Sequence, residues 1–536
     1  MFAEKFVFVV KAKGQGIVGA EFLRNFTHHN HPVNSPVPDY LREAEALRPF
    51  YRWSPVRPDP EAIANERRFP NERRSVLTAA LQRQYQQLPR RKEVQSAIAA
   101  LGEKTTFCIT TGQQPMLYGG PLYVLYKAVG AVKTAREWEK RLPGRKVVPV
   151  FWMAGEDHDA SEVNHAYLSY DEKVAYSGAL WGAVGRNVIA PASAHVPTHA
   201  RPFYRPGLGW NEAFRAWLDK LLGPYGLVVI DGDDPALKAL FFPVVKRELT
   251  EGTGAMAALD TTRRLTGLGY AAQARIRNPN LFFLDDSGRF RLERDGDGFL
   301  LKGSDRRLSM QELHDKPPVF FSPNVVLRPV YQETILPSLA YLGGPGELAY
   351  WLQLKATFAA FDVAFPAVLR RPGATLISAS DAEKLKRMRF DIEDVLRPES
   401  ELRRECAARL WNRQTYAPYL DHVMQSLERL ETTAGVLSPS QAMSVAAQKR
   451  KIQRFFDRLV HQTDKEALNR HPRAWKPLLR IKNRVQPDGF IQERTLNLAA
   501  VGMAPKAFVA FLMEQLDVRK ADNFLVLPGK AEAPAE

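Results

Sequence analysis

The feature that most constrains the fold is a strand–helix–strand pattern in the first third of the chain. Thr105–Thr110 (TTFCIT) is β-branched and aromatic, which predicts a buried strand that ends abruptly at the polar turn Thr111–Pro115. A helix with one apolar face follows from Pro121, and Val147–Met153 (VVPVFWM) is a second predicted strand. Because βαβ units almost always have parallel strands and a right-handed connection, we expect an α/β fold.

Parallel neighbours end at the same edge of a sheet, and open α/β sheets bind their ligands at that carboxyl edge. The loops Thr111–Pro115 and Gly155–Asp159 should therefore lie side by side. The sequence predicts an enzyme whose active site is formed where these two loops meet.

The strand–helix pattern recurs later in the chain, so the predicted core is discontinuous. Gly226–Ile230 is followed by a helix, and Leu339–Leu342 is followed by a glycine-rich loop, a helix through Phe361 and a strand near Ala364–Leu369. Between these parts, alternating residues and Asp/Gly turns predict an antiparallel meander. Its strands are expected at Leu281–Leu284, Phe290–Glu293 and Phe299–Lys302.

Helical spacing dominates after Ser380. Apolar residues three or four apart predict helices through Leu385, Met388, Ile392 and Val395, and through Leu420, Val423, Leu427 and Leu430. Ser438-Pro439 supplies an N-cap and a first-turn proline for a further helix with Ile452, Phe455 and Leu459. With Gly435 between them, these helices predict a hairpin with coiled-coil packing; ordinary helices lying on the core are the alternative.

These patterns give a predicted domain organisation. It comprises a parallel-sheet α/β core over 1–255 with a small insertion near 160–205, a β-rich inserted segment over 256–325, a second part of the core over 326–380, an α-helical coiled coil over 381–470, and a C-terminal return to the core with a disordered tail over 471–536.

Composition limits the class of protein. The short N-terminal run Phe6–Val10 does not fit a signal peptide, and no apolar run is long enough to span a bilayer, so a soluble, cytoplasmic protein without a membrane partner is expected. The two cysteines, Cys108 and Cys406, have no metal-binding spacing.

A formal net charge of +16, partly concentrated in Lys449–Arg484, indicates a nucleic-acid surface, a solvated helix face or a field for anionic substrates. Nucleic acid is the less favoured partner.

The densest titratable cluster follows the second predicted strand, at Glu156, Asp157, His158 and Asp159. Like charges this close raise one another's pKa unless a cation or a donor relieves them. The cluster is a candidate for acid–base catalysis by His158 with a neighbouring aspartate, or for holding a divalent metal. Alternatively, Asp159 caps the next helix and the other side chains are solvated.

Other candidates lie on the same expected edge. Gly112, Gln113 and Gln114 offer backbone N–H groups and amides to an anion, although a plain tight turn is an alternative. Lys127, in the helix that follows, is placed to reach a phosphate or a carboxylate. The loop with Gly344 and Glu347 is a third strand end, and Arg328 is a possible carboxylate clamp or a structural ion-pair partner.

Five motifs in order make the chain similar to a known family. They are TTGQQPMLYGGPLYVLYKAVGAVKTA, VVPVFWMAGEDHDASEVNH, GLVVIDGDDPALKALFFPVVKREL, SPNVVLRPVYQETILPSLAYLGGPGELAYWLQLK and PDGFIQERTLN. Together they resemble the bacillithiol biosynthesis cysteine-adding family over nearly the whole chain. The resemblance implies a Rossmann-like core with connecting insertions, related to class I synthetases, and a coiled coil that forms a homodimer.

The resemblance also implies an activity: a ligase joins L-cysteine to the amine of glucosaminyl-malate. An amide cannot form from a free carboxylate in water without activation, so ATP or ADP and Mg²⁺ are expected cofactors. The HIGH and KMSKS motifs of true synthetases are absent. Under this hypothesis Arg328 and Lys127 bind carboxylate or phosphate, Gln113 and Gln114 position the sugar or malate, and His158 with Asp157 or Asp159 deprotonates the amine.

Two other classes of function remain as alternatives. One is a metal-dependent hydrolase or deacetylase that acts on a glycosylated small molecule. The other is a basic RNA-binding protein that uses the Lys449–Arg484 face.

Overall fold

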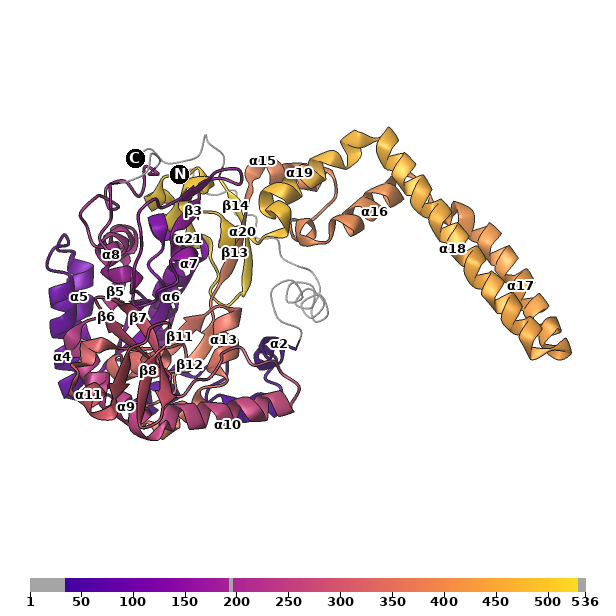
Figure 1. The fold of residues 1–536 in the computed structure, drawn as a ribbon. Helices are drawn as coiled ribbons and strands as arrows, with labels where there is room; N and C mark the ends of the chain where they lie inside the picture. Colours follow the sequence, from indigo (N-terminus) through magenta and orange to yellow (C-terminus); the bar gives the residue numbers. More distant parts are fainter. Residues whose placement is uncertain (1–33, 192–195, 529–536) are drawn as a thin grey trace. The chain divides into compact units, whose positions relative to one another are not determined.

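The computed structural model describes residues 34–191 and 196–528 (Figure 1). The predictions for Phe6–Val10 and for the tail over 529–536 lie outside these residues. The chain divides into two compact units, of which the first comprises Met1–Ala374 with Glu493–Asn523 and the second comprises Thr375–Gln492 with Phe524–Glu536. No helix in the described part of the chain is both long and apolar enough to cross a bilayer.

The first unit is built on a five-stranded sheet with the order β12-β11-β1-β2-β5, in which every pairing is parallel. The strands are β1 (Thr106–Gln113), β2 (Lys146–Met153), β5 (Val228–Asp231), β11 (Ser338–Gly343) and β12 (Ala367–Arg370). The chain leaves β1 toward β2 on one side, whereas β11 lies on the other, so the strand order reverses between β1 and β11. Ligand crevices of open α/β sheets lie at such a point, outside the carboxyl ends.

Both faces of this sheet are covered, which explains why its strands are apolar without alternation. Helix α6 (Tyr123–Arg141) places Ala131, Ala135 and Trp138 against Phe107 and Ile109 on one face. On the other face, Cys108 and Trp152 join a larger core. Helices α4 (Asn71–Gln84), α5 (Lys92–Ala100) and α9 (Pro235–Glu251) contribute to that core.

Strand β1 is longer than predicted. The sequence placed its end before Thr111, but Thr111, Gly112 and Gln113 continue the strand, and Gly112 pairs with Trp152 of β2. A Cβ atom on Gly112 would lie 2.8 Å from the main-chain oxygen of Trp152. This glycine is therefore explained by the approach of the neighbouring strand, and the prediction of a loop at 111–113 is wrong.

The predicted meander is present as a second, antiparallel sheet with the order β10-β6-β7-β8-β9. Its strands are β6 (Leu281–Asp285), β7 (Gly288–Asp295), β8 (Gly298–Leu301), β9 (Arg307–Ser309) and β10 (Phe321–Pro323). A helix, α10 (Thr253–Gly267), precedes it. We call these five strands the inserted sheet.

The first unit is completed by a late segment, Glu493–Asn523, which we call the return segment. The buried Asn497 donates hydrogen bonds to the carbonyl oxygens of Tyr118 (3.0 Å) and Gly120 (2.7 Å), in the loop that follows β1. Helix α21 (Pro505–Gln515) packs against α6 and against α8 (Trp210–Leu222). The return segment therefore holds the loop that leads from β1 into α6.

The second unit is helical. Its helices are α15 (Ala379–Arg387), α16 (Glu399–Leu410), α17 (Ala417–Leu437), α18 (Pro439–Arg470) and α19 (Lys476–Val485). Helices α17 and α18 pack along each other as a hairpin (Figure 1), and the hydroxyl of Ser438 caps α18 as predicted. Leu420, Val423 and Leu427 are half-buried in α17, whereas Leu430 is exposed.

Two details of the helical prediction are wrong. The helix through Leu385 ends at Arg387, and Arg389 has a left-handed backbone (φ 57°), so Val395 reaches the same apolar cluster from a separate turn. Gly435 lies inside α17, and the turn is at Ser438. Periodicity places these residues in the core correctly but does not detect the break in the backbone.

Candidate functional site

The two predicted loops meet at the carboxyl edge of the parallel sheet. Gln114, just after β1, donates from Nε2 to Asp157 Oδ2 and to Glu162 Oε2, both at 2.8 Å. Asp157 and Glu162 follow β2. Both N–H groups of the Gln114 amide are used, so this side chain links the end of β1 to the carboxylates after β2.

Lys127 is buried in α6, and all three of its N–H donors are used within the protein. Its Nζ lies 2.7 Å from the Gly112 carbonyl oxygen, 3.1 Å from Gln113 Oε1 and 2.6 Å from Glu347 Oε2. Burial lowers the pKa of Lys127, and the nearby Glu347 carboxylate opposes this. Lys127 thus joins β1 to the loop after β11, and a direct contact to a ligand would require one of these bonds to break.

Glu347 lies in α13 (Pro345–Trp351) and forms a capping box with Gly344, whose N–H donates to Glu347 Oε2 at 2.7 Å. The Tyr341 hydroxyl donates to its other oxygen. Burial raises the pKa of Glu347, but Lys127, Tyr341 and the Gly344 N–H outweigh it, and the pKa is lowered. Glu347 therefore remains a carboxylate that fixes the third strand-end loop.

Arg328 begins α12 (Arg328–Ile335), and its guanidinium has neutral partners. It donates to Gln332 Oε1 at 3.0 Å and to the Tyr350 hydroxyl at 3.1 Å, and lies 5.6 Å from the centre of the Tyr341 ring. No carboxylate among the described residues forms an ion pair with it, and Glu347 acts on it only from a longer distance. A half-buried cation with spare donors and without a carboxylate partner is suited to bind an anion.

The acidic cluster after β2 separates into two environments. Glu156 points inward, where Lys238 Nζ lies 2.6 Å from Glu156 Oε1 and 2.6 Å from Asp233 Oδ1. Burial raises the pKa of Glu156 despite the neighbouring Lys238. Asp233 also pairs with Arg186. Glu156 is thus one member of a compensated buried network.

Asp157 and His158 lie nearer the surface and contact Arg289. Asp157 accepts from the main-chain N–H of His158 at 2.7 Å, and Arg289 lies 3.4 Å from it. Burial raises the pKa of Asp157, but the Arg289 cation and the hydrogen bonds from the Gln114 amide and the main-chain N–H of His158 outweigh it and hold the pKa below its usual value. Asp159 accepts from the Ser161 N–H (3.1 Å) and caps α7 (Ala160–Val163), the structural role considered for it.

Two family models divide the chain between them. The one described as "Bacillithiol biosynthesis BshC, N-terminal Rossmann-like domain" matches residues 25–372, and the one described as "Bacillithiol biosynthesis BshC, C-terminal coiled-coil domain" matches residues 374–527. The chain belongs to the BshC family. Its Rossmann-like sheet and its long C-terminal helices agree with both descriptions, and the resemblance seen in the five motifs is confirmed.

Curated BshC relatives align over most of their length. A protein of Cytophaga hutchinsonii is 32% identical over 489 residues, which are 89% of this chain and 94% of the relative. A protein of Flavobacterium psychrophilum is 31% identical, with 86% and 91% covered, and one of Christiangramia forsetii is 30% identical, with 91% and 96% covered. All three are named "Putative cysteine ligase BshC".

Sequence reasoning missed two cations of this BshC site. Lys238 lies in the first turn of α9, the helix after β5, just as Lys127 lies in the helix after β1. This similar position could have identified Lys238 from the sequence. Arg289 comes from the inserted sheet, and no local pattern connects it to His158, which lies more than a hundred residues earlier. Only the long-range fold reveals that contact.

The donor set does not form a metal site within the described residues, because no group of three or more His, Cys, Asp or Glu side chains is arranged to hold an ion. Glu156 is paired with Lys238, Asp157 is held by Gln114, and Asp159 caps a helix. The side chains of the acidic cluster therefore do not fit a protein-held Mg²⁺ ion.

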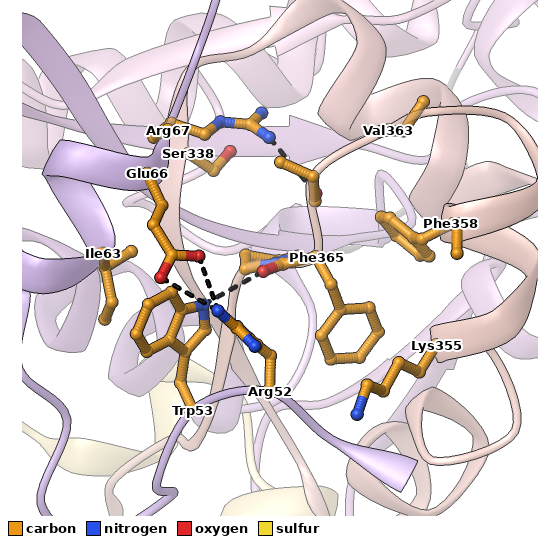
Figure 2. A pocket seen from close by; sticks show the side chains of 13 residues that line it. Arg52, Trp53, Ile63, Glu66, Arg67, Ser338, Lys355, Phe358, Val363 and Phe365 are labelled. Carbon is orange, nitrogen blue, oxygen red and sulfur yellow. Dashed lines mark hydrogen bonds and ion pairs between the residues drawn. The ribbon is translucent and has the colours of Figure 1, made fainter. Parts of the chain in front are cut away.

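A cavity of about 210 Å³ lies at the opposite edge of the sheet, where the strands begin (Figure 2). Ser338, the first residue of β11, and Pro366, just before β12, line it together with Trp53, Phe358 and Phe365. Arg52 pairs with Glu66 beside it. Its walls are mostly apolar, and none of the predicted site residues lines it.

Proposed function

We propose that this protein is a cysteine ligase of bacillithiol biosynthesis, which joins the carboxyl carbon of L-cysteine to the amine of glucosaminyl-malate as an amide. The observation that carries the proposal is membership, over residues 25–372 and 374–527, of a family whose curated relatives are named "Putative cysteine ligase BshC". The convergence of three strand-end loops at a carboxyl edge with an unpaired cation supports it.

Arg328 is the anion-binding residue in this proposal. An arginine has five N–H donors in a planar fork. The hydrogen bonds of Arg328 go to neutral groups, so its remaining N–H groups can bind a carboxylate in a bidentate pair. Both substrates carry carboxylates: cysteine has one and the malate group has two. Lys127 and Glu347 hold the surrounding loops in place, and Gln114 aligns Asp157 with Glu162.

The cysteine carboxylate requires activation before an amine can attack it, and we propose ATP as the source, with ADP as the other nucleotide that the site accepts. A nucleotide would supply a phosphate or adenylate leaving group. Any Mg²⁺ would arrive on the phosphates, the usual mode of Mg²⁺ binding at ATP sites. Both cysteines of the chain are free and buried, which fits the reducing cytoplasm as the compartment.

We also propose that the protein is a homodimer through the α17–α18 hairpin. Apolar side chains stand exposed on this hairpin at Leu430, Val436, Leu437, Met443 and Phe455. The double variant Leu430→Asp with Phe455→Asp should halve the mass measured by light scattering, whereas Gln425→Asp on the same helix should not. A wild-type protein that is monomeric at micromolar concentration would contradict the dimer.

The activity is tested with purified protein, L-cysteine, glucosaminyl-malate and ATP with Mg²⁺, and the product is followed by mass spectrometry. Formation of the cysteinyl amide that depends on all components is the expected result. Release of an acyl group from an acylated substrate without amide formation would favour the hydrolase alternative instead. Retention of RNA that falls steeply with salt would favour the RNA-binding alternative. Neither alternative is favoured by the relatives' names.

A further inference from the structure

Arg289 connects the inserted sheet to the candidate site. It lies on β7 with a buried side chain (7% exposed). Its Nε donates to Ser322 Oγ at 3.1 Å and its Nη2 to the Pro323 carbonyl oxygen at 3.2 Å. The guanidinium lies 3.8 Å from the centre of the Phe282 ring. Three contacts within the inserted sheet therefore fix the guanidinium, and its remaining nitrogen, Nη1, is directed at the end of β2.

Arg289 Nη1 lies 3.0 Å from His158 Nδ1. An arginine nitrogen can only donate a hydrogen bond, so His158 Nδ1 must accept with its lone pair. A neutral imidazole that accepts at Nδ1 carries its proton on Nε2. The contact therefore defines the tautomer of His158.

The competing contact is weaker. His158 Nδ1 also lies 3.5 Å from Asp157 Oδ1, to which it could donate only if it carried a proton. That proton would then point at the positively charged Arg289 Nη1 group across 3.0 Å, and the two N–H groups would repel each other. A doubly protonated imidazolium would meet the same opposition, so the arrangement favours the Nε2–H form.

We propose that Arg289 is a positioning residue that holds His158 as the Nε2–H tautomer, and that His158 donates this hydrogen bond to an oxygen of the substrate. His158 is half exposed, so a ligand can reach it. The substrate oxygen that gains negative charge when an amine attacks an acyl group is the partner such a donor stabilises. The identity of this oxygen rests on the proposed ligase function, whereas the tautomer does not. In this proposal His158 is a hydrogen-bond donor and not the base expected from the sequence, because the protonated Nε2 has no free lone pair to take up a proton.

The tautomer is measured directly by ¹⁵N NMR of histidine-labelled full-length protein near neutral pH, without substrate. His158→Asn identifies the signals among the eleven histidines. The expected wild-type spectrum has an unprotonated Nδ1 and a protonated Nε2. A protonated Nδ1 with a free Nε2, or an imidazolium, would overturn the proposal whatever the enzyme's activity.

Arg289→Gln tests the positioning role. The expected result is a change of the His158 signals toward the Nδ1–H form paired with Asp157, with kcat lowered about 10²-fold and KM nearly constant. Arg291→Gln is the matched control, since Arg291 lies on the same strand and pairs with Glu293. If Arg289→Gln keeps the wild-type tautomer, the positioning role is wrong. If it does not fold, Arg289→Met, which removes every donor at this position and keeps an apolar side chain beside Phe282, gives the same comparison.

The two possible failures are distinguishable. If the ¹⁵N spectrum shows another form of His158 while the protein still makes the amide, the inference about His158 is wrong and the ligase proposal stands. An Nε2–H tautomer in a protein that forms no amide refutes the ligase proposal and leaves the positioning contact standing.

Discussion

The two edges of the parallel sheet are built on different principles. At the carboxyl edge, charged side chains compensate one another closely: Lys127 is saturated by its three acceptors, and Lys238 by two carboxylates and the Val319 carbonyl oxygen. At the amino edge, an apolar cavity lies beside the buried pair Arg67 and Glu333. Arg328 and His158 are left with groups that can face a ligand, and both belong to the carboxyl edge. Hydrogen-bond donors without a charged partner therefore mark the site better than empty volume does.

The largest expected effect is on stability at the carboxyl edge. Lys238→Met leaves Glu156 and Asp233 buried beside each other without their shared cation, which should cost about 3–5 kcal/mol of unfolding free energy. Chemical denaturation measures it. Lys246→Met, on the exposed side of the same helix, is the control. A loss below about 1 kcal/mol, typical of exposed pairs, would show that this network is not closely compensated.

The next effect is the pH dependence of the amino edge. Burial raises the pKa of Glu333 to about 7 from 4.5, although Arg67 opposes this. Between pH 4.5 and about 7, the folded protein therefore keeps a proton on Glu333 that the unfolded chain has lost. The protonated Glu333 stabilises the fold fully below pH 4.5, and this contribution is lost as the pH rises through about 7.

The unfolding free energy should accordingly fall by about 3 kcal/mol over that window, relative to Glu333→Gln. Denaturation of both proteins across the pH range measures the difference. Parallel curves for wild type and variant would show that Glu333 does not titrate there, and that the two edges differ less than their geometry indicates.

A smaller effect is expected on catalysis. Arg328→Gln removes the unpaired cation, and loss of charge-assisted hydrogen bonds should lower kcat/KM by about 10–10²-fold with little change in melting temperature. Steady-state kinetics with each substrate in turn identifies which carboxylate is bound. Unchanged kinetics in the folded variant would remove Arg328 from the site.

The smallest effect is predicted for the cavity. Ala359→Leu places additional apolar volume at its lining and should change kcat/KM by less than about twofold and stability by less than about 1 kcal/mol. The amide assay and thermal denaturation measure these values. A tenfold loss of activity would mean that the amino edge takes part in the reaction, and the contrast between the edges would be broken.

The sequence predicted the parallel strands and the meeting of the loops after β1 and β2, because hydrophobic runs and βαβ handedness determine both. It did not predict the end of β1, since polar Thr111 and Gly112 form ladder pairs as well as apolar residues do. It named Lys127 as a ligand-binding residue, and only the packing shows that its donors are all used. Arg289 could not be predicted from the sequence, because its contact to His158 joins two elements that are distant in sequence.

The return segment has a consequence for synthesis on the ribosome. The carbonyl groups of Tyr118 and Gly120 emerge early, but the amide of Asn497 that binds them is translated more than 370 residues later. The first unit therefore cannot finish folding until Thr375–Gln492, the main part of the second unit, has been translated. A nascent chain holds its β1–α6 loop incomplete for most of its translation, so a prematurely released fragment would lack the finished edge even if its sheet had formed.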